Sequence, residues 1–109
     1  MDVDVLGSQR TITDDVRERT VTKIGRLGKL APVLEVAQVR FSNDQERPAV
    51  SRWACHAVLR GHGHEIFGHA EATDPLGAVD AVVAKLEHQV ERLKGKLIGR
   101  SHPRHENSP

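Results

Sequence analysis

The sequence has few aromatic residues and a single cysteine. Its 109 residues include one Trp, two Phe and no Tyr, so a hydrophobic core must be built mainly from Val, Leu, Ile and Ala. One cysteine excludes an internal disulfide and favours a reducing compartment. We expect Cys55 to be a small buried strand residue. With no long apolar run and no signal-peptide pattern, the sequence predicts a cytoplasmic protein without a membrane partner.

A strong excess of charge of one sign is also missing. Sixteen Lys and Arg residues face fifteen Asp and Glu residues, which gives a net charge of +1 with neutral histidines. This total does not by itself favour nucleic acid, so any such function must depend on where the charges lie. The length fits one domain with a modest core.

The residue patterns of common enzyme classes are absent. We find no glycine-rich phosphate loop, no Ser/His/Asp arrangement and no carboxylate pair recognisable by spacing, so we expect no catalysis, no cofactor and no small-molecule substrate. Four histidines lie close together in the sequence, and two of them form an H-x-H pair: His56, His62, His64 and His69. Because no Cys or carboxylate stands at ligand spacing, we expect surface histidines without metal, and keep a metal-binding histidine cluster as an alternative. At acidic pH these histidines could add positive charge and tighten the binding of any RNA partner.

Residues Asp74 to Ile98 predict one long amphipathic helix. Asp74 is a good N-cap, and Pro75 suits the first helical position because its missing N–H costs nothing there. Apolar residues then recur at steps of three and four and form one stripe: Leu76, Val79, Val83, Leu86, Val90, Leu93 and Leu97.

The charges of this helix are sorted by sign. At 100° per residue, four basic side chains fall within about 80° of each other, opposite the stripe: Lys85, His88, Arg92 and Lys96. Asp80, Glu87 and Glu91 gather on a different flank. A face that only needs solvation usually mixes its signs, so this pattern predicts a surface that binds a polyanion.

A second helix is expected from Thr13, its N-cap, to about Leu30. Its predicted buried side consists of Val16, Thr20, Ile24 and Leu27, and its basic flank of Arg19, Lys23, Arg26 and Lys29. Cations near a helix C-terminus are also favoured by the helix dipole, so this flank alone does not establish a binding face. Gly25 and Gly28 indicate close packing or a close ligand backbone, and we favour packing.

Four segments alternate between apolar and polar residues, as half-buried strands do: Asp2–Leu6, Glu35–Ser42, Val50–Arg60 and His64–Ala72. A polar loop, Asn43–Pro48, and a tight turn, Gly61–Gly63, connect the last three. Small inward residues in the last strand leave room for the long helix, and Trp53 is expected in the core. The order βαβββα predicts an α+β two-layer sandwich: a four-stranded sheet with both helices packed on one face and the other face exposed. Residues 1–100 would form this domain, and Ser101–Pro109 a disordered polar tail.

Three ordered signatures resemble those of the ribosome hibernation-promoting factor family, also called the ribosome-associated inhibitor or protein Y family. The first signature, I-T-x-x-(hydrophobic)-R, is matched by Ile12, Thr13, Val16 and Arg17. The second is matched by Lys23, Ile24, Arg26, Leu27 and Lys29. The third is matched by Asp74, Leu76, Ala78, Val79, Asp80, Lys85, Leu86, Glu87 and Gln89. The resemblance spans roughly residues 1–98, although Leu76 replaces a common tyrosine.

The resemblance implies a βαβββα domain that binds 16S rRNA of the small ribosomal subunit in the mRNA and tRNA channel and blocks translation sterically under stress. Carried over by position, the rRNA-binding candidates are Lys23, Arg26, Lys29, Lys85, His88, Arg92 and Lys96, and His88 stands where the family often has arginine. Many members carry a second, dimerising domain after a linker, and we expect that domain to be absent from this chain.

Other functions remain open at this point. A generic double-stranded RNA-binding or regulatory interaction domain of similar fold would share the sorted charges. The near-heptad stripe could serve a coiled-coil partner, although the sheet needs the same stripe for its core. Base stacking requires exposed aromatic side chains, and the only candidates are Phe41, Trp53 and Phe67, so the sequence disfavours a single-stranded RNA reader of the aromatic-sheet type.

Overall fold

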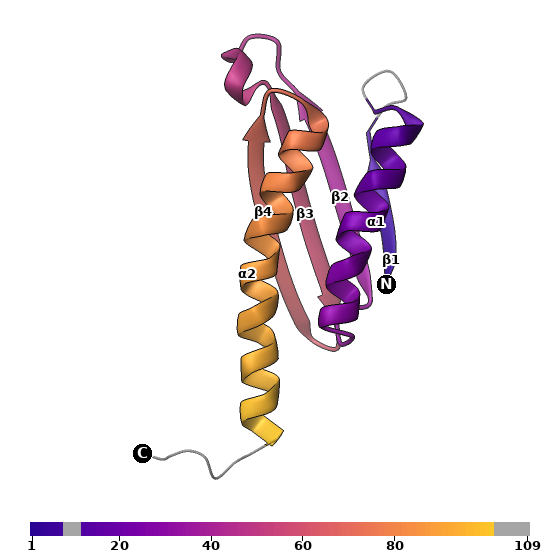
Figure 1. The fold of residues 1–109 in the computed structure, drawn as a ribbon, viewed down its shortest axis with the longest axis vertical. Helices are drawn as coiled ribbons and strands as arrows, with labels where there is room; N and C mark the ends of the chain where they lie inside the picture. The colour runs from indigo at the N-terminus through magenta and orange to yellow at the C-terminus, as the bar shows by residue number, and fades with distance from the viewer. Residues whose placement is uncertain (8–11, 102–109) are drawn as a thin grey trace.

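The computed structural model describes residues 1–7 and 12–101 and contains one four-stranded sheet and two helices (Figure 1). In chain order the elements are β1 (Asp2–Leu6), α1 (Asp14–Leu30), β2 (Val36–Asn43), the short 3-10 helix η1 (Ala49–Ser51), β3 (Trp53–Gly61), β4 (His64–Ala72) and α2 (Pro75–Ser101). The predicted α+β sandwich with the order βαβββα is confirmed. No helix of the described chain is long and apolar enough to cross a membrane.

The strands lie in the order β1-β2-β3-β4, so β1 and β4 form the two edges of the sheet. β1 pairs with β2 in parallel, and α1 supplies the crossover that a parallel pair requires. β2, β3 and β4 are antiparallel neighbours. The two-residue turn His62–Gly63 joins β3 to β4, with φ angles of 49° and 79° that suit a tight hairpin.

Both helices lie on the same face of the sheet (Figure 1). α1 packs against β1, α2 packs against β3 and β4, and the helices contact each other. The inward strand residues and the apolar helix faces form a single buried cluster. Outward residues of the strands are largely exposed, so the opposite face of the sheet is open.

Side chains cap both helices at their predicted start. The Thr13 hydroxyl accepts a hydrogen bond from the Val16 amide at 3.2 Å, and the Asp74 carboxylate accepts one from the Gly77 amide at 2.6 Å. Arg17 donates to the carbonyl oxygen of Val5 at 2.6 Å and thereby ties α1 to the end of β1. The arginine of the first signature therefore has a structural contact within the fold.

The helix faces buried in the core are close to those predicted. All four residues predicted for the buried side of α1 are buried. In α2 the predicted stripe is buried at Val79, Leu86, Val90 and Leu93 and partly buried at Leu76, Val83 and Leu97. Ala78 and Val82 are also fully buried, so the stripe is wider than predicted.

The small inward residue Gly68 allows α2 to approach β4, as expected. A Cβ atom at Gly68 would lie 3.1 Å from Cγ2 of Val82 and 3.3 Å from Cδ2 of Leu86. The packing explanation is wrong for Gly25, where a Cβ would meet nothing within 4 Å. At Gly28 a Cβ would meet the Met1 side chain at 2.7 Å, so packing does account for that glycine.

The structure differs from the predictions at the start of β3, in the burial of Trp53 and at the end of α2. β3 begins at Trp53 instead of Val50, because the chain after Pro48 forms the 3-10 turn η1, in which the Ser51 amide donates to the Pro48 carbonyl at 2.9 Å. Trp53, at the start of the strand, is partly buried instead of forming core. α2 continues to Ser101, so this residue belongs to the helix and not to the tail. Residues 102–109 of the predicted tail lie outside the described residues.

Candidate nucleic-acid interface

The three candidate residues of α1 differ in their surroundings. Nζ of Lys23 lies 2.9 Å from Oδ1 of Asp80, so this lysine is paired with α2. Arg26 and Lys29 are exposed, and neither has an ion-pair partner within 4 Å among the described residues. Arg19 on the same flank pairs with Asp15 at 3.3 Å. The free positive charge of α1 therefore lies in its second half. We call Lys23, Arg26 and Lys29 the α1 surface.

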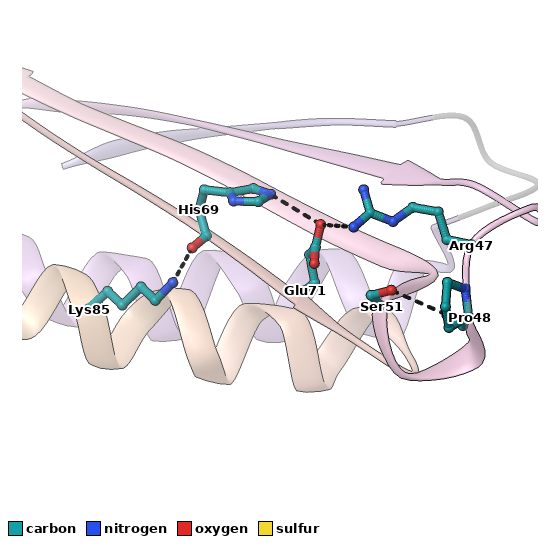
Figure 2. A network of polar contacts seen from close by, with 6 residues as sticks. All are labelled: Arg47, Pro48, Ser51, His69, Glu71 and Lys85. Carbon is teal, nitrogen blue, oxygen red and sulfur yellow. Dashed lines mark hydrogen bonds and ion pairs between the residues drawn. The ribbon is translucent and has the colours of Figure 1, made fainter.

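The Lys85 side chain reaches the free edge of the sheet. Its ammonium group donates to the carbonyl oxygen of His69 in β4 at 2.6 Å, a contact visible in Figure 2. One turn later, the Gln89 amide group donates to the carbonyl oxygen of Phe67 at 2.6 Å. These two side chains satisfy acceptors of an edge strand that could otherwise pair with another chain. Lys85 remains exposed, so its charge is accessible to a ligand from outside.

Arg92 and Lys96 continue the same line along α2. Together with His64, Glu65 and Ile66 at the start of β4, they border a shallow groove. Both side chains are exposed, as is His88 on the neighbouring turn. We call Lys85, His88, Arg92 and Lys96 the β4-edge surface. The prediction that these residues lie opposite the apolar stripe is wrong in one respect: Lys85, Arg92 and Lys96 occupy its flank, since α2 rests on the sheet with that side next to β4.

The structure does not join the seven candidates into one patch. Asp80 contacts Lys23 of α1, and at 100° per residue Glu87 and Glu91 lie on the same flank of α2 as Asp80. This acidic flank therefore separates the β4-edge surface from the α1 surface. A polyanion that touches both must pass over α2 or around its end.

The four clustered histidines of the sequence lie in different places. The rings of His56 and His69 lie next to each other on the open sheet face, with centroids 4.4 Å apart and planes tilted by 32°. His62 lies in the hairpin turn with Nε2 3.1 Å from Glu35, and His64 borders the groove on the helix side. In the described part of the chain, no group of three or more His, Cys, Asp or Glu residues could hold a metal ion.

Two titratable groups are perturbed by their surroundings. The pKa of His56 is lowered, first by burial and then by the nearby His69 and Arg40, while Glu71 acts in the opposite direction. Burial raises the pKa of the Cys55 thiol to about 12. Cys55 is fully buried, as predicted, and a protonated, inaccessible thiol cannot act as a nucleophile.

The sequence reasoning missed one group of residues. Arg40, His56 and His69 lie side by side on three adjacent strands of the open sheet face. The alternation of apolar and polar residues predicts that these side chains point outward. Only the register of the paired strands shows that they are neighbours.

Comparison with known proteins relates the sequence of the chain to a family. Residues 3–98 match the family described as Sigma 54 modulation protein / S30EA ribosomal protein. The chain is 30% identical over 104 residues to the ribosome hibernation promoting factor of Salmonella typhimurium, a match that covers 89% of this chain and 97% of the relative. It is 29% identical over 100 residues to the protein of that name from Azotobacter vinelandii, covering 92% of this chain and 89% of the relative.

Two solved structures share the fold. A ribosomal subunit interface protein from Coxiella burnetii superimposes with a TM-score of 0.72 at 23% identity, covering 87% of this chain and 99% of that one. The N-terminal domain of Protein Y from Thermus thermophilus gives a TM-score of 0.68 at 26% identity, covering 85% of this chain and 99% of that one.

Proposed function

The chain belongs to the Sigma 54 modulation protein / S30EA ribosomal protein family, and we propose that it is a ribosome hibernation factor that binds 16S rRNA of the small subunit in the mRNA and tRNA channel. It acts there by occupying space, without catalysis, and its place of action is the cytoplasm. Relatives that bear the name ribosome hibernation promoting factor support the general role.

The observation that carries the rRNA contact is the β4-edge surface. Lys85, Arg92 and Lys96 follow one another along an exposed flank of α2, on the side away from Asp80, Glu87 and Glu91. A line of cations with no interspersed acid on its own helix flank is complementary in charge to the phosphates of an RNA strand. The α1 surface adds Arg26 and Lys29 as contacts to a second stretch of rRNA.

Such contacts give affinity without reading base sequence. Basic side chains bind phosphates, and specificity comes from the shape of the folded RNA that surrounds the protein. Since the two basic surfaces lie on different sides of the acidic flank, they fit a channel with RNA on more than one wall better than a single straight duplex. This arrangement favours the ribosomal channel over the generic double-stranded RNA-binding domain.

Sedimentation with purified 30S subunits tests the proposal. The wild-type protein should co-sediment at low salt and be released at raised salt, and the variant Arg92→Glu/Lys96→Glu should stay in the supernatant. The matched pair is Lys96→Glu and Lys94→Glu, because each changes the net charge by two units, the first on the β4-edge surface and the second on the neighbouring, α1-facing flank of the same helix. Wild-type protein that fails to sediment with 30S subunits at low salt would refute the proposal.

The channel itself is tested by competition. Binding of an mRNA fragment and initiator tRNA to 30S subunits should be reduced by wild-type protein and should in turn displace it. Simultaneous binding of all three at full occupancy would place the protein elsewhere on the subunit.

A further inference from the structure

Three side chains with basic nitrogen atoms form a row across the open face of the sheet. Strand register places Arg40 of β2 directly opposite His56 of β3, and His56 directly opposite His69 of β4. Directly opposite residues on one sheet face have Cβ atoms about 4.5–5.5 Å apart, so their side chains interact. The two imidazole rings lie next to each other, with 4.4 Å between their centroids and an angle of 32° between their planes. All three residues are exposed.

An aromatic ring and a hollow adjoin this row. Phe67 points outward from β4 two residues before His69, and 66% of its surface is exposed. On the other side, the same sheet face has a hollow of about 390 Å³. Its lining combines apolar with polar side chains: Leu6, Gln38, Arg40, Ser42, His56 and Val58. Apolar walls with a few hydrogen-bonding groups are typical of sites that bind small organic groups.

Both glutamates of β4 near the row are already engaged. The Glu71 carboxylate lies 2.8 Å from Arg47 and 3.9 Å from Nε2 of His69 (Figure 2). Glu65 lies 2.6 Å from Arg60. When His56 is protonated, it and Arg40 are two cations directly opposite one another, and the nearby Glu71 carboxylate also serves Arg47. Like charges directly opposite one another are destabilising in a sheet, and a bound anion would relieve this repulsion.

We propose that the open sheet face is a second RNA-binding surface, which holds a single-stranded segment with a phosphate at Arg40, His56 and His69 and a base stacked on Phe67. Single-stranded RNA is the occupant that fits this combination, because it offers an anion and a planar ring in each repeating unit. The surface lies on the face of the sheet opposite the helices, so it goes beyond the rRNA contacts proposed for α1 and α2.

Binding to this surface should strengthen in acid. The groups that face His56 are Arg40 of β2 and His69 and Glu71 of β4. In the free protein, burial and then His69 and Arg40 lower the pKa of His56, and Glu71 only partly offsets this. A phosphate placed against the ring stabilises the protonated form and raises that pKa. A group whose pKa is higher in the complex binds its ligand more tightly as the pH falls, by about tenfold for each unit of pKa difference.

The test uses a fluorescein-labelled oligouridylate 12-mer and the full chain, with fluorescence anisotropy at pH 7.5 and 5.5 and constant ionic strength. Wild-type protein should bind about tenfold more tightly at pH 5.5. The variant His56→Gln/His69→Gln should lose this gain, and Phe67→Ala should bind more weakly at both pH values. These side chains are exposed, so the variants should retain the wild-type unfolding midpoint. His64→Gln is the control, a histidine of the same strand on the helix side that should keep the gain.

Three results would overturn the proposal. One is an affinity for the oligouridylate that is the same at pH 7.5 and pH 5.5. Another is a higher affinity at pH 5.5 that persists in His56→Gln/His69→Gln. The third is formation of a dimer at pH 5.5, detected by sedimentation equilibrium and lost in Phe67→Ala, which would assign the face to a second copy of the chain. Binding of Arg92→Glu/Lys96→Glu to 30S subunits is measured separately, so failure of the ribosomal proposal would not decide this test.

Discussion

Lys23 and Asp80 form an ion pair of 2.9 Å that joins α1 to α2. The pair lies between the two helices and shows which way the charged flanks of α2 face. Its acidic flank is turned toward α1, and its basic flank is turned toward β4. This relationship divides the seven candidate residues into the α1 surface and the β4-edge surface.

Replacing Asp80 should release Lys23 and increase the affinity for RNA. In Asp80→Asn the lysine loses its partner and α2 loses one negative charge, so we expect tighter, more salt-sensitive binding to 30S subunits. Stability should fall by no more than about 1 kcal/mol, because the pair is largely exposed. The measurements are a 30S titration and thermal unfolding. Glu46→Gln, an exposed acid in the β2–β3 loop, is the control for net charge, and an equal gain in this variant would contradict the specific role of Asp80.

Enlarging Gly68 should destabilise the fold. A Cβ atom at this position already lies at tight contact distance from Val82 and Leu86, so Gly68→Val would push α2 away from β4. We expect a loss of about 1–3 kcal/mol in the free energy of unfolding, measured with urea. An unchanged midpoint would mean that α2 is not seated on β4 as described.

Replacing Gly25 by a larger residue should stabilise the fold instead. It lies inside α1 with open space where a Cβ would be, so Gly25→Ala should stabilise the helix by about 0.5–1 kcal/mol. Thermal unfolding measures the gain. The same variant should bind 30S subunits as wild type does, and weaker binding would instead indicate that the rRNA backbone approaches α1 at this position.

The Cys55 thiol should be unreactive in the native protein. With its pKa raised to about 12, it carries almost no thiolate at pH 8, and it is fully buried as well. Reaction with a disulfide reagent at pH 8 should be slow in buffer and fast in denaturant. Because the folded pKa exceeds the unfolded value, native stability should decline as the pH rises from about 9 toward 12, where only the unfolded state releases the proton.

Much of the fold was predictable because local patterns and global packing agree. The caps at Thr13 and Asp74, the alternation in each strand and the turn at Gly63 all point to the observed elements. The start of β3 was not predictable from alternation, since the residues after Pro48 alternate in the same way whether they form a strand or the turn η1.

The candidate site was less predictable than the fold. Helical periodicity sorted the charges of α2 correctly but could not show what each flank faces. The pairing of Lys23 with Asp80, and of Lys85 with the His69 carbonyl, depends on how the helices rest on the sheet. The row formed by Arg40, His56 and His69 depends on strand register, which a single sequence does not specify at distances beyond one hairpin.

The most direct test of the ribosomal role is the salt dependence of 30S binding. The logarithm of the affinity is measured against the logarithm of the salt concentration for wild-type protein and for Arg92→Gln/Lys96→Gln. If both side chains bind rRNA phosphates, the slope of the variant should be smaller in magnitude by about 1.4–1.8, because each neutralised phosphate contributes about 0.7–0.9 to the slope. An unchanged slope and affinity in the variant would show that the β4-edge surface does not bind the RNA.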